Sequence, residues 1–235
     1  RAPSMLALQA VYAPLRWSPT VRLVSALFGR DVAHDEVTLA GSRAVLLQTR
    51  AARARHAAAA ERARRARAPP PERPTVLFIP GGGFIADFEA VDYFFLHRWV
   101  READVLVAYL SYDQAPQAPY PAPMLCVLRA FQALKTDDHS LGFRAAPLVL
   151  SGLSAGGNLA TAALLAPLLP QHAPVELDDV PPLMPDGLLL LCPVLHLCRS
   201  PSPSRVLFAS DVLLPHPLLK AFAHAYDQGK DHWVV

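Results

Sequence analysis

The stretch at residues 147–160 constrains the fold of this chain more than any other part of the sequence. It reads Pro-Leu-Val-Leu-Ser-Gly-Leu-Ser-Ala-Gly-Gly-Asn-Leu-Ala, which is an apolar run, a glycine-rich corner and then small residues. Residues 148–150 are typical of a buried strand, and the alanines and leucines that follow the corner suit a helix. This stretch therefore predicts a strand, a tight turn and a helix in direct succession.

Gly152, Ser154 and Gly156 form the pattern G-x-S-x-G in this corner. In the nucleophile elbow, that pattern holds a serine on a strained turn with its hydroxyl exposed. Glycines are needed because the helix crosses the strand end two residues before and two residues after the serine, where a Cβ atom would collide. We interpret Ser154 as a candidate nucleophile; a plain glycine-rich connection between strand and helix is the alternative.

Other apolar runs alternate with helix-forming segments along the chain. The expected buried strands are residues 76–79, 105–110, 148–151 and 188–192. The expected helices between them include residues 90–103 and 124–134. This alternation predicts an α/β fold with a mainly parallel sheet covered by helices on both faces.

At 235 residues, the chain is long enough for one α/β domain of ordinary size and too short for two. We expect an N-terminal helical cap or lid at residues 1–30, which packs on the domain, lines a substrate pocket or touches a lipid surface. A core is expected at residues 31–235, incomplete at its C-terminal end. It begins with a hairpin at residues 36–49, whose expected buried residues are Val37, Leu39, Val45 and Leu47.

Residues 50–71 are a basic insertion rich in alanine, arginine and proline. Seven arginines lie between positions 50 and 67, against the single acid Glu61. Such a run can bind nucleic acid or an anionic membrane, but it lacks interleaved aromatic residues and a known nucleic-acid module. We therefore expect a solvated, partly helical insertion and no nucleic-acid partner.

Composition narrows the class of protein. A hydrophobic content of 52% with a formal charge of +2 excludes wholesale disorder, and no apolar run reaches the length of about 18 residues that suggests a membrane span. We expect a soluble protein, and peripheral lipid contact stays open. The cysteines Cys126, Cys192 and Cys198 are an odd number without metal-type spacing, so we expect core thiols, no disulfide and no metal. Oligomeric state is left open.

Two further loops accompany the elbow pattern. Three glycines, Gly81 to Gly83, and Phe84 follow the first expected strand of the alternating series, and a proline-rich loop at residues 112–122 follows the next. With residues 151–159, these loops resemble three signatures of the hormone-sensitive lipase family of α/β-hydrolases, in the same order: H-G-G-G-F, Y-R/S-L-A-P-E-x-P-F/Y-P-A and G-D-S-A-G-G-N-L. The resemblance covers about residues 70–200 and implies an α/β-hydrolase fold.

The resemblance also implies a chemistry, the hydrolysis of a small-molecule ester or acyl lipid without a cofactor. Ser154 forms the acyl-enzyme, and Gly81, Gly152 and Gly156 support the turn and loop. The backbone N–H groups of Gly82, Gly83 and Ala155 form the oxyanion hole. Each such donor stabilises the developing charge by about 3 to 4 kcal/mol.

Three positions depart from the family pattern. Pro80, Leu153 and Gln117 stand where the family has histidine, aspartate and glutamate. None of them is the nucleophile or a backbone donor, so the reaction can survive, but each change removes a polar group near the loops. The alternative function is therefore a catalytically silent hydrolase-fold protein that binds a ligand or a partner.

The serine also needs a histidine that is oriented by a carboxylate, in the chain order Ser, Asp/Glu, His. Asp211 precedes His224 and His232, and Asp227 and Asp231 precede His232. However, residues 205–227 resemble the family's helical segment before the acid and histidine loops. We therefore expect the triad acid and base beyond Val235. The first residue is Arg1, without a signal-peptide pattern, so a fragment or processed product is expected and the cytoplasm is favoured.

Overall fold

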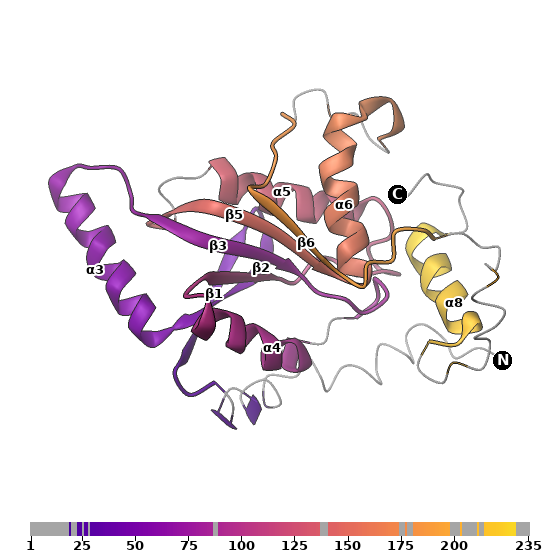
Figure 1. The fold of residues 1–235 in the computed structure, drawn as a ribbon. Coiled ribbons are helices and arrows are strands. Elements are labelled where there is room, and N and C mark those ends of the chain that lie inside the picture. Colours follow the sequence, from indigo (N-terminus) through magenta and orange to yellow (C-terminus); the bar gives the residue numbers. More distant parts are fainter. Residues whose placement is uncertain are drawn as a thin grey trace.

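The computed structural model describes residues 19, 23–24, 26–27, 29–86, 89–136, 141–173, 177, 181–197, 203, 211 and 214–228. Its strands form a six-stranded sheet with the order β1-β2-β4-β3-β5-β6 (Figure 1). The strands are β1 (Val32–Leu39), β2 (Ser42–Thr49), β3 (Glu72–Ile79), β4 (Leu106–Leu110), β5 (Arg144–Leu153) and β6 (Gly187–Leu191). The predicted cap at residues 1–30 lies almost entirely outside the described residues.

Helices cover both faces of this sheet, as the sequence predicts (Figure 1). The described helices are α3 (Arg50–Ala66), α4 (Glu89–Glu102), α5 (Ala122–Thr136), α6 (Ala155–Leu168), the 3-10 turn η1 (Pro170–His172) and α8 (His216–Asp227). Helix α4 lies on one face, and α5 and α6 lie on the other. Within the part of the chain that the structure describes, no helix combines the length and apolar character needed to cross a bilayer.

The sheet is mixed rather than purely parallel. Strands β4, β3, β5 and β6 are parallel to their neighbours in this series, whereas β2 is antiparallel to both β1 and β4. The predicted hairpin is present: Ala40 and Gly41 join β1 to β2 with φ angles of 48° and 89°. Two positive φ angles suit a two-residue turn that matches the twist of the strands.

The central strands are apolar on both faces because each face has its own core. Along β3, Leu77 and Ile79 pack in the cluster that includes residues of α5 and α6, whereas Val76 and Phe78 pack in the cluster that includes residues of α4. Side chains of a strand point alternately to the two faces. This alternation explains why the strand has a continuous apolar run instead of alternating polar and apolar residues.

Two expectations of burial are wrong at β6. Leu188 and Leu189 are 46% and 41% exposed, and Cys192 is exposed, although a buried strand and a core thiol were expected. The reason is the strand order: β6 lies at the edge of the described sheet and pairs with β5 alone. Cys126, by contrast, is buried as expected.

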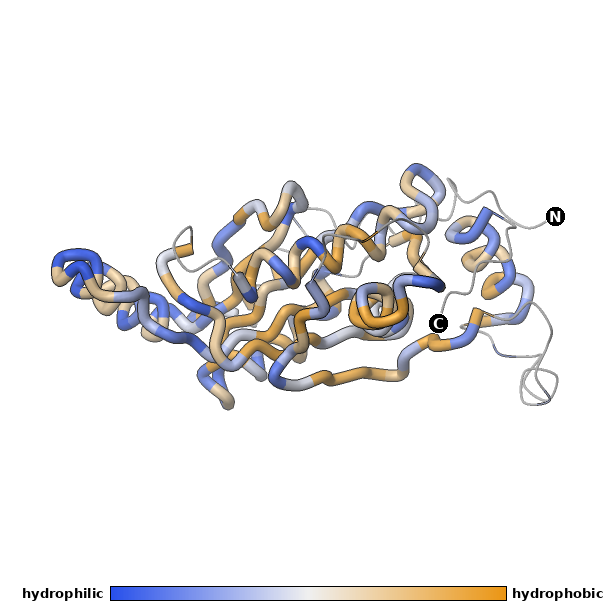
Figure 2. The backbone as a smooth tube through the Cα atoms, turned by 90° about the horizontal axis from the view of Figure 1, so that it is seen from above, coloured by the Kyte–Doolittle hydropathy of each residue, from blue (hydrophilic) through white to orange (hydrophobic). Residues whose placement is uncertain are grey.

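The basic insertion at residues 50–71 is partly helical, as expected: residues 50–66 form the continuous helix α3, and residues 67–71 are not helical. Thr49 begins it, with its side-chain oxygen accepting a hydrogen bond of 3.1 Å from the N–H of Ala52, and Arg67 ends it in the left-handed region at φ 53°. Figure 2 shows many hydrophilic residues along α3, whereas the strands are mostly hydrophobic.

Candidate active site

Ser154 stands at the corner between β5, which ends at Leu153, and α6, which begins at Ala155. Its backbone has φ 52° and ψ −115°, a conformation that residues with a side chain rarely adopt. Hydrogen bonds hold the corner on both sides: the Ser154 N–H donates to the Leu191 carbonyl at 2.9 Å, and the Ser154 carbonyl accepts from the Val194 N–H at 3.1 Å. The surrounding backbone therefore imposes this strained conformation on the serine.

Two glycines let the helix cross the strand end at this corner. A Cβ atom on Gly152 would lie 2.7 Å from the Cα of Gly157, and one on Gly156 would collide with the carbonyl oxygens of Ile79 and Pro80. These contacts are with backbone atoms, which cannot move aside. The steric reason for the G-x-S-x-G pattern, expected from the sequence, is present in the structure.

The loop at residues 81–84, which we call the glycine loop, lies beside the serine. A Cβ atom on Gly81 would lie 3.3 Å from the Cβ of Ser154. The loop turns sharply, with φ angles of 118° at Gly82, 62° at Gly83 and 68° at Phe84. The structure therefore brings together the elbow and glycine-loop residues that the sequence singled out.

The proline-rich loop joins the same region. The N–H of Ala115 donates a 2.9 Å hydrogen bond to the carbonyl of Phe84. Among the positions that depart from the family pattern, Pro80 is buried, Leu153 is half-buried and Gln117 is exposed. Gln117 thus lies on the outside of the loop, while Pro80 and Leu153 directly precede the glycine loop and Ser154.

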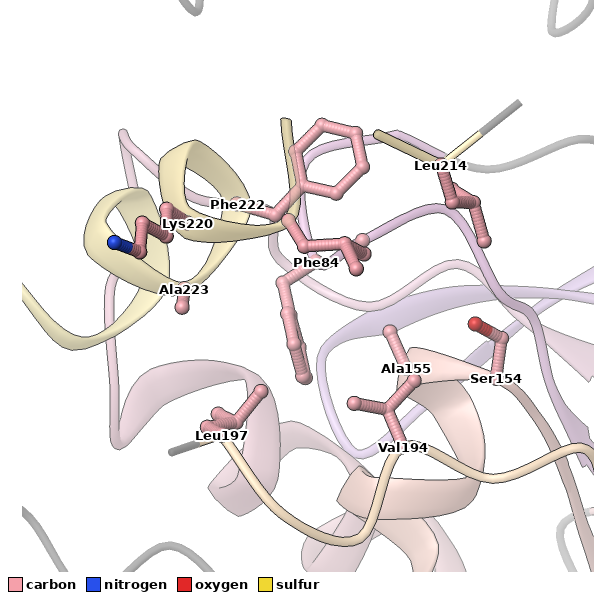
Figure 3. A pocket seen from close by; sticks show the side chains of 11 residues that line it. Phe84, Ser154, Ala155, Val194, Leu197, Leu214, Lys220, Phe222 and Ala223 are labelled. Atoms are coloured by element: carbon pink, nitrogen blue, oxygen red, sulfur yellow. The ribbon is translucent and has the colours of Figure 1, made fainter. Parts of the chain in front are cut away.

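A pocket of about 80 Å³ opens at Ser154 (Figure 3). Gly83 and Ala155 also line it. Its apolar side chains are Phe84, Val194, Leu197, Leu214, Leu219, Phe222 and Ala223. Lys220 is the charged residue among the described lining residues, and Figure 3 shows its ammonium group pointing away from Ser154. The Ser154 hydroxyl therefore faces an apolar space.

Helix α8 supplies one wall of this pocket and is fixed to the glycine loop. A Cβ atom on Gly83 would lie 2.7 Å from ring atoms of Phe222, so the ring rests directly on the loop. The ring of Tyr226 stacks on Phe84, and its carbonyl accepts a 2.8 Å hydrogen bond from the N–H of Tyr120. Burial, together with the neighbouring Tyr120 and Tyr112, raises the pKa of Tyr226 well above its usual range.

Sequence reasoning gave no site role to α8. The signal in the sequence was the spacing of Phe222 and Tyr226. These residues are four positions apart, so they lie on the same face of a helix. That spacing indicates a buried face, but it does not indicate that this face covers a loop about 140 positions earlier in the chain.

The described acids and histidines do not complete a triad. Among the described residues, no hydrogen bond joins the Ser154 hydroxyl to a histidine, and His224 is exposed. His216 begins α8, and its Nε2 is buried without a described hydrogen-bond partner. Asp211 is exposed and accepts a 3.0 Å hydrogen bond from the N–H of Leu214, whereas Asp227 is buried.

The remaining candidates, Asp231 and His232, lie outside the described residues. Within the described ranges, no group of three or more His, Cys, Asp or Glu residues is arranged to hold a metal ion.

Comparison with known proteins identifies relatives of this chain. A family model described as alpha/beta hydrolase fold matches residues 76–235. Hormone-sensitive lipase of Mus musculus is 34% identical over 168 residues, which are 70% of this chain but 21% of that protein. The chain thus spans about a fifth of the length of this curated relative.

Solved structures show the same fold. The esterase of Pyrobaculum calidifontis superposes with a TM-score of 0.69 at 19% identity, covering 96% of this chain and 65% of that one. A hormone-sensitive lipase from a metagenome library superposes with a TM-score of 0.63 at 22% identity, covering 97% of this chain and 69% of that one.

Proposed function

The chain belongs to the alpha/beta hydrolase fold family and is a distant homologue of hormone-sensitive lipases, and from this premise we propose that it hydrolyses carboxylic esters through an acyl-enzyme on Ser154. One observation carries the proposal: Ser154 sits on a strained corner between strand and helix, beside the glycine loop and open to an apolar pocket. A strained residue that faces a pocket is a candidate for function.

In the proposed reaction, the Ser154 oxygen attacks the carbonyl carbon of the ester and gives up its proton to a base. The carbonyl π electrons move to the carbonyl oxygen, which becomes an oxyanion. Collapse of this intermediate expels the alcohol, which takes up the proton, and leaves the acyl group on Ser154. Water then repeats the sequence and releases the acid.

The N–H groups of Gly82, Gly83 and Ala155 are the proposed donors to that oxyanion. Ala155 is the first residue of α6, so its N–H has no acceptor within the helix, and the helix dipole adds positive potential there. Donors that are already oriented stabilise the transition state without a cost of reorganisation.

We propose that the catalytic histidine and the carboxylate that orients it lie outside the described residues. This proposal is supported by the lack of a described histidine on the Ser154 hydroxyl and by the motifs, which cover the nucleophile and the loops but not the acid and histidine. Their role would be to take the serine proton and later return it to the leaving alcohol.

The pocket suggests the size of the acyl group. The pocket volume of about 80 Å³ is small, which favours a short acyl chain. Its apolar lining favours an uncharged chain, because a buried charge without a partner costs several kcal/mol. Small-molecule esters are therefore the substrates that we propose to test first.

A catalytically silent binding protein is the second candidate. Pro80 and Leu153 favour it, because both replace polar residues of the family pattern directly next to the glycine loop and Ser154. Such a protein would bind an acyl ligand in the same pocket without turnover.

Fluorophosphonate labelling separates the two functions, because the probe reacts with an activated serine. We expect labelling at Ser154 in the full-length protein, which supplies the acid and base expected beyond Val235, loss of labelling in Ser154→Ala, and unchanged labelling in Ser151→Ala, whose side chain is buried on β5. Binding of butyrate esters without labelling or turnover would favour the silent protein. Absence of both binding and labelling would reject the pocket as a ligand site.

A further inference from the structure

Helix α3 has a face of small residues and a face of arginines. Ala52 is buried, and His56, Ala59, Ala60 and Ala63 are half-buried at helical spacing. The exposed arginines of the helix are Arg50, Arg53, Arg55, Arg62, Arg64 and Arg65. The helix contacts β1 and β2, and Figure 1 shows it projecting beyond the end of the sheet, with its arginines exposed to solvent.

The arginines at the start of α3 are matched by groups of the fold. Arg53 forms an ion pair of 2.8 Å with Asp35 of β1, and Arg55 forms one of 2.6 Å with Asp104 before β4. Arg50 donates from Nε to the carbonyl of Arg30 at 3.1 Å. These three side chains therefore attach the helix to the body of the protein.

The arginines at the end of the helix are not matched in this way. We call Arg62, Arg64, Arg65 and Arg67 the distal arginine cluster; all four are exposed. Glu61 is the acid beside them, and it accepts hydrogen bonds from Arg64 at 2.9 Å and from Arg65 at 2.7 Å. Four arginines and one glutamate leave residues 61–67 with a net charge of +3.

A purely structural role accounts for part of this cluster. Arg64 and Arg65 lie in the last turn, where positive charge complements the helix dipole. Arg62 and Arg67 have no ion pair with a described residue. Like charges this close repel one another, so an anionic partner would lower the energy of the cluster.

The cluster is remote from the pocket. Figure 1 shows α3 at the end of the sheet where β5 begins, and α8 at the other end, where β5 leads into the Ser154 corner. Figure 2, turned by 90°, shows the same separation. A role for the cluster is therefore independent of the chemistry at Ser154.

We propose that the distal arginine cluster docks an acidic segment of a partner protein. Planar guanidinium groups form paired hydrogen bonds to carboxylates. Arg62 and Arg65, three positions apart on the helix, have Cβ atoms about 5–6 Å apart. Carboxylates at alternate positions of an extended peptide repeat at about 6.6–6.8 Å, which long arginine side chains can match.

Other anionic partners fit less well. Helices that bind a membrane surface place large apolar side chains against the lipid, whereas the uncharged residues of α3 are mainly alanines. A membrane at this end would also lie away from the pocket. Single-stranded nucleic acids are bound with aromatic platforms, and residues 50–67 contain no Phe, Trp or Tyr.

The test uses the whole chain and a fluorescein-labelled octapeptide of alternating glutamate and glycine, with binding measured by fluorescence anisotropy at low and moderate salt. One variant changes the four cluster arginines to glutamine, which retains helix propensity. The matched control changes Arg30, Arg98, Arg129 and Arg144, which are exposed elsewhere, and so loses the same charge. We expect the cluster variant to bind at least about tenfold more weakly and the control within about twofold of the original chain.

Equal weakening in both variants would overturn the proposal, because only net charge would then matter. Absence of peptide binding would also overturn it, as would tighter binding of phosphatidylserine vesicles or duplex DNA that depends on the same arginines. If circular dichroism shows that the fourfold variant loses helix, the double variant Arg62→Glu and Arg67→Glu replaces it. It keeps the Arg64 and Arg65 contacts to Glu61 and should abolish peptide binding.

Discussion

The ring of Tyr226 stacks on the ring of Phe84, with centroids 4.0 Å apart and planes inclined by 9°. Phe84 ends the glycine loop, and Tyr226 lies in the last turn of α8. Both residues are almost completely buried. This contact therefore joins the wall of the pocket to the loop that holds the proposed oxyanion donors.

The hydroxyl of Tyr226 leads to a first prediction. It is buried and lacks a hydrogen-bond partner among the described residues, a situation that costs about 1–3 kcal/mol. Tyr226→Phe keeps the stacked ring and removes the hydroxyl, so the free energy of unfolding in urea should rise by about 1 kcal/mol. Tyr226→Ala should lower it by about 3 kcal/mol because a cavity replaces the ring. A loss of stability in Tyr226→Phe comparable to that in Tyr226→Ala would contradict this account.

Phe222 should limit the length of the acyl chain. Phe222→Ala removes the ring that rests on Gly83 and lengthens the pocket on that side. The ratio of kcat/KM for p-nitrophenyl octanoate to that for p-nitrophenyl butyrate should rise by about tenfold, since each added methylene can gain up to about 0.8 kcal/mol on burial. Phe94→Ala, at a half-exposed ring on α4, is the control. Turnover with an unchanged ratio would reject this role of Phe222, whereas lack of turnover on all esters would instead reject the proposed reaction.

Gly156 should not tolerate even one added methyl group. In Gly156→Ala the new Cβ meets two backbone oxygens, so we expect a loss of at least about 3 kcal/mol of stability or failure to fold. Gly187→Ala is the matched control, because a Cβ there lies 3.5 Å from Val149 in an ordinary contact. Thermal unfolding of both variants measures the difference. Similar melting temperatures of Gly156→Ala and Gly187→Ala would show that the backbone around Ser154 can shift to accommodate the added methyl group.

The two histidines between β1 and α4 should make the fold sensitive to acid. The Nε2 atoms of His34 and His97 are 2.9 Å apart, and burial, followed by the nearby His34 and Arg101, lowers the pKa of His97 to about 4. Burial also lowers the pKa of His34. In the unfolded chain each of these histidines binds a proton near pH 6.5, whereas in the folded chain each binds it only at lower pH.

The contribution to stability is therefore complete above about pH 6.5 and is lost as the pH falls toward about 4, by up to about 1.4 kcal/mol per pH unit for each proton. Urea unfolding between pH 7 and pH 4.5 measures this slope. His97→Gln should reduce the slope, and His224→Gln, at an exposed position, should leave it unchanged. Equal slopes in the original chain and His97→Gln would refute the assignment.

The sequence predicts those parts of the fold that local patterns determine. The runs at β3 and β4 are buried on both faces and bounded by turn residues, and the glycine spacing around Ser154 allows little except a sharp corner. The resemblance to the hormone-sensitive lipase family, inferred from three motifs, is confirmed by the family match and by the curated relatives. The assignment of the oxyanion donors and of the triad stays a prediction.

Features set by long-range order were missed. Leu188 and Leu189 have the composition of a buried strand, but exposure depends on which strands flank β6, and strand order is not encoded locally. The docking of Phe222 on Gly83 joins segments about 140 residues apart, and no local pattern specifies such a contact.

The positive φ at Ser154 implies a conflict between durability and reactivity. Glycine would adopt φ 52° with little penalty, whereas a residue with a side chain pays about 1–3 kcal/mol to do so. A chain selected for thermal endurance alone would therefore favour glycine at this position. Keeping a hydroxyl there consumes part of the small margin by which a native state exceeds the unfolded ensemble.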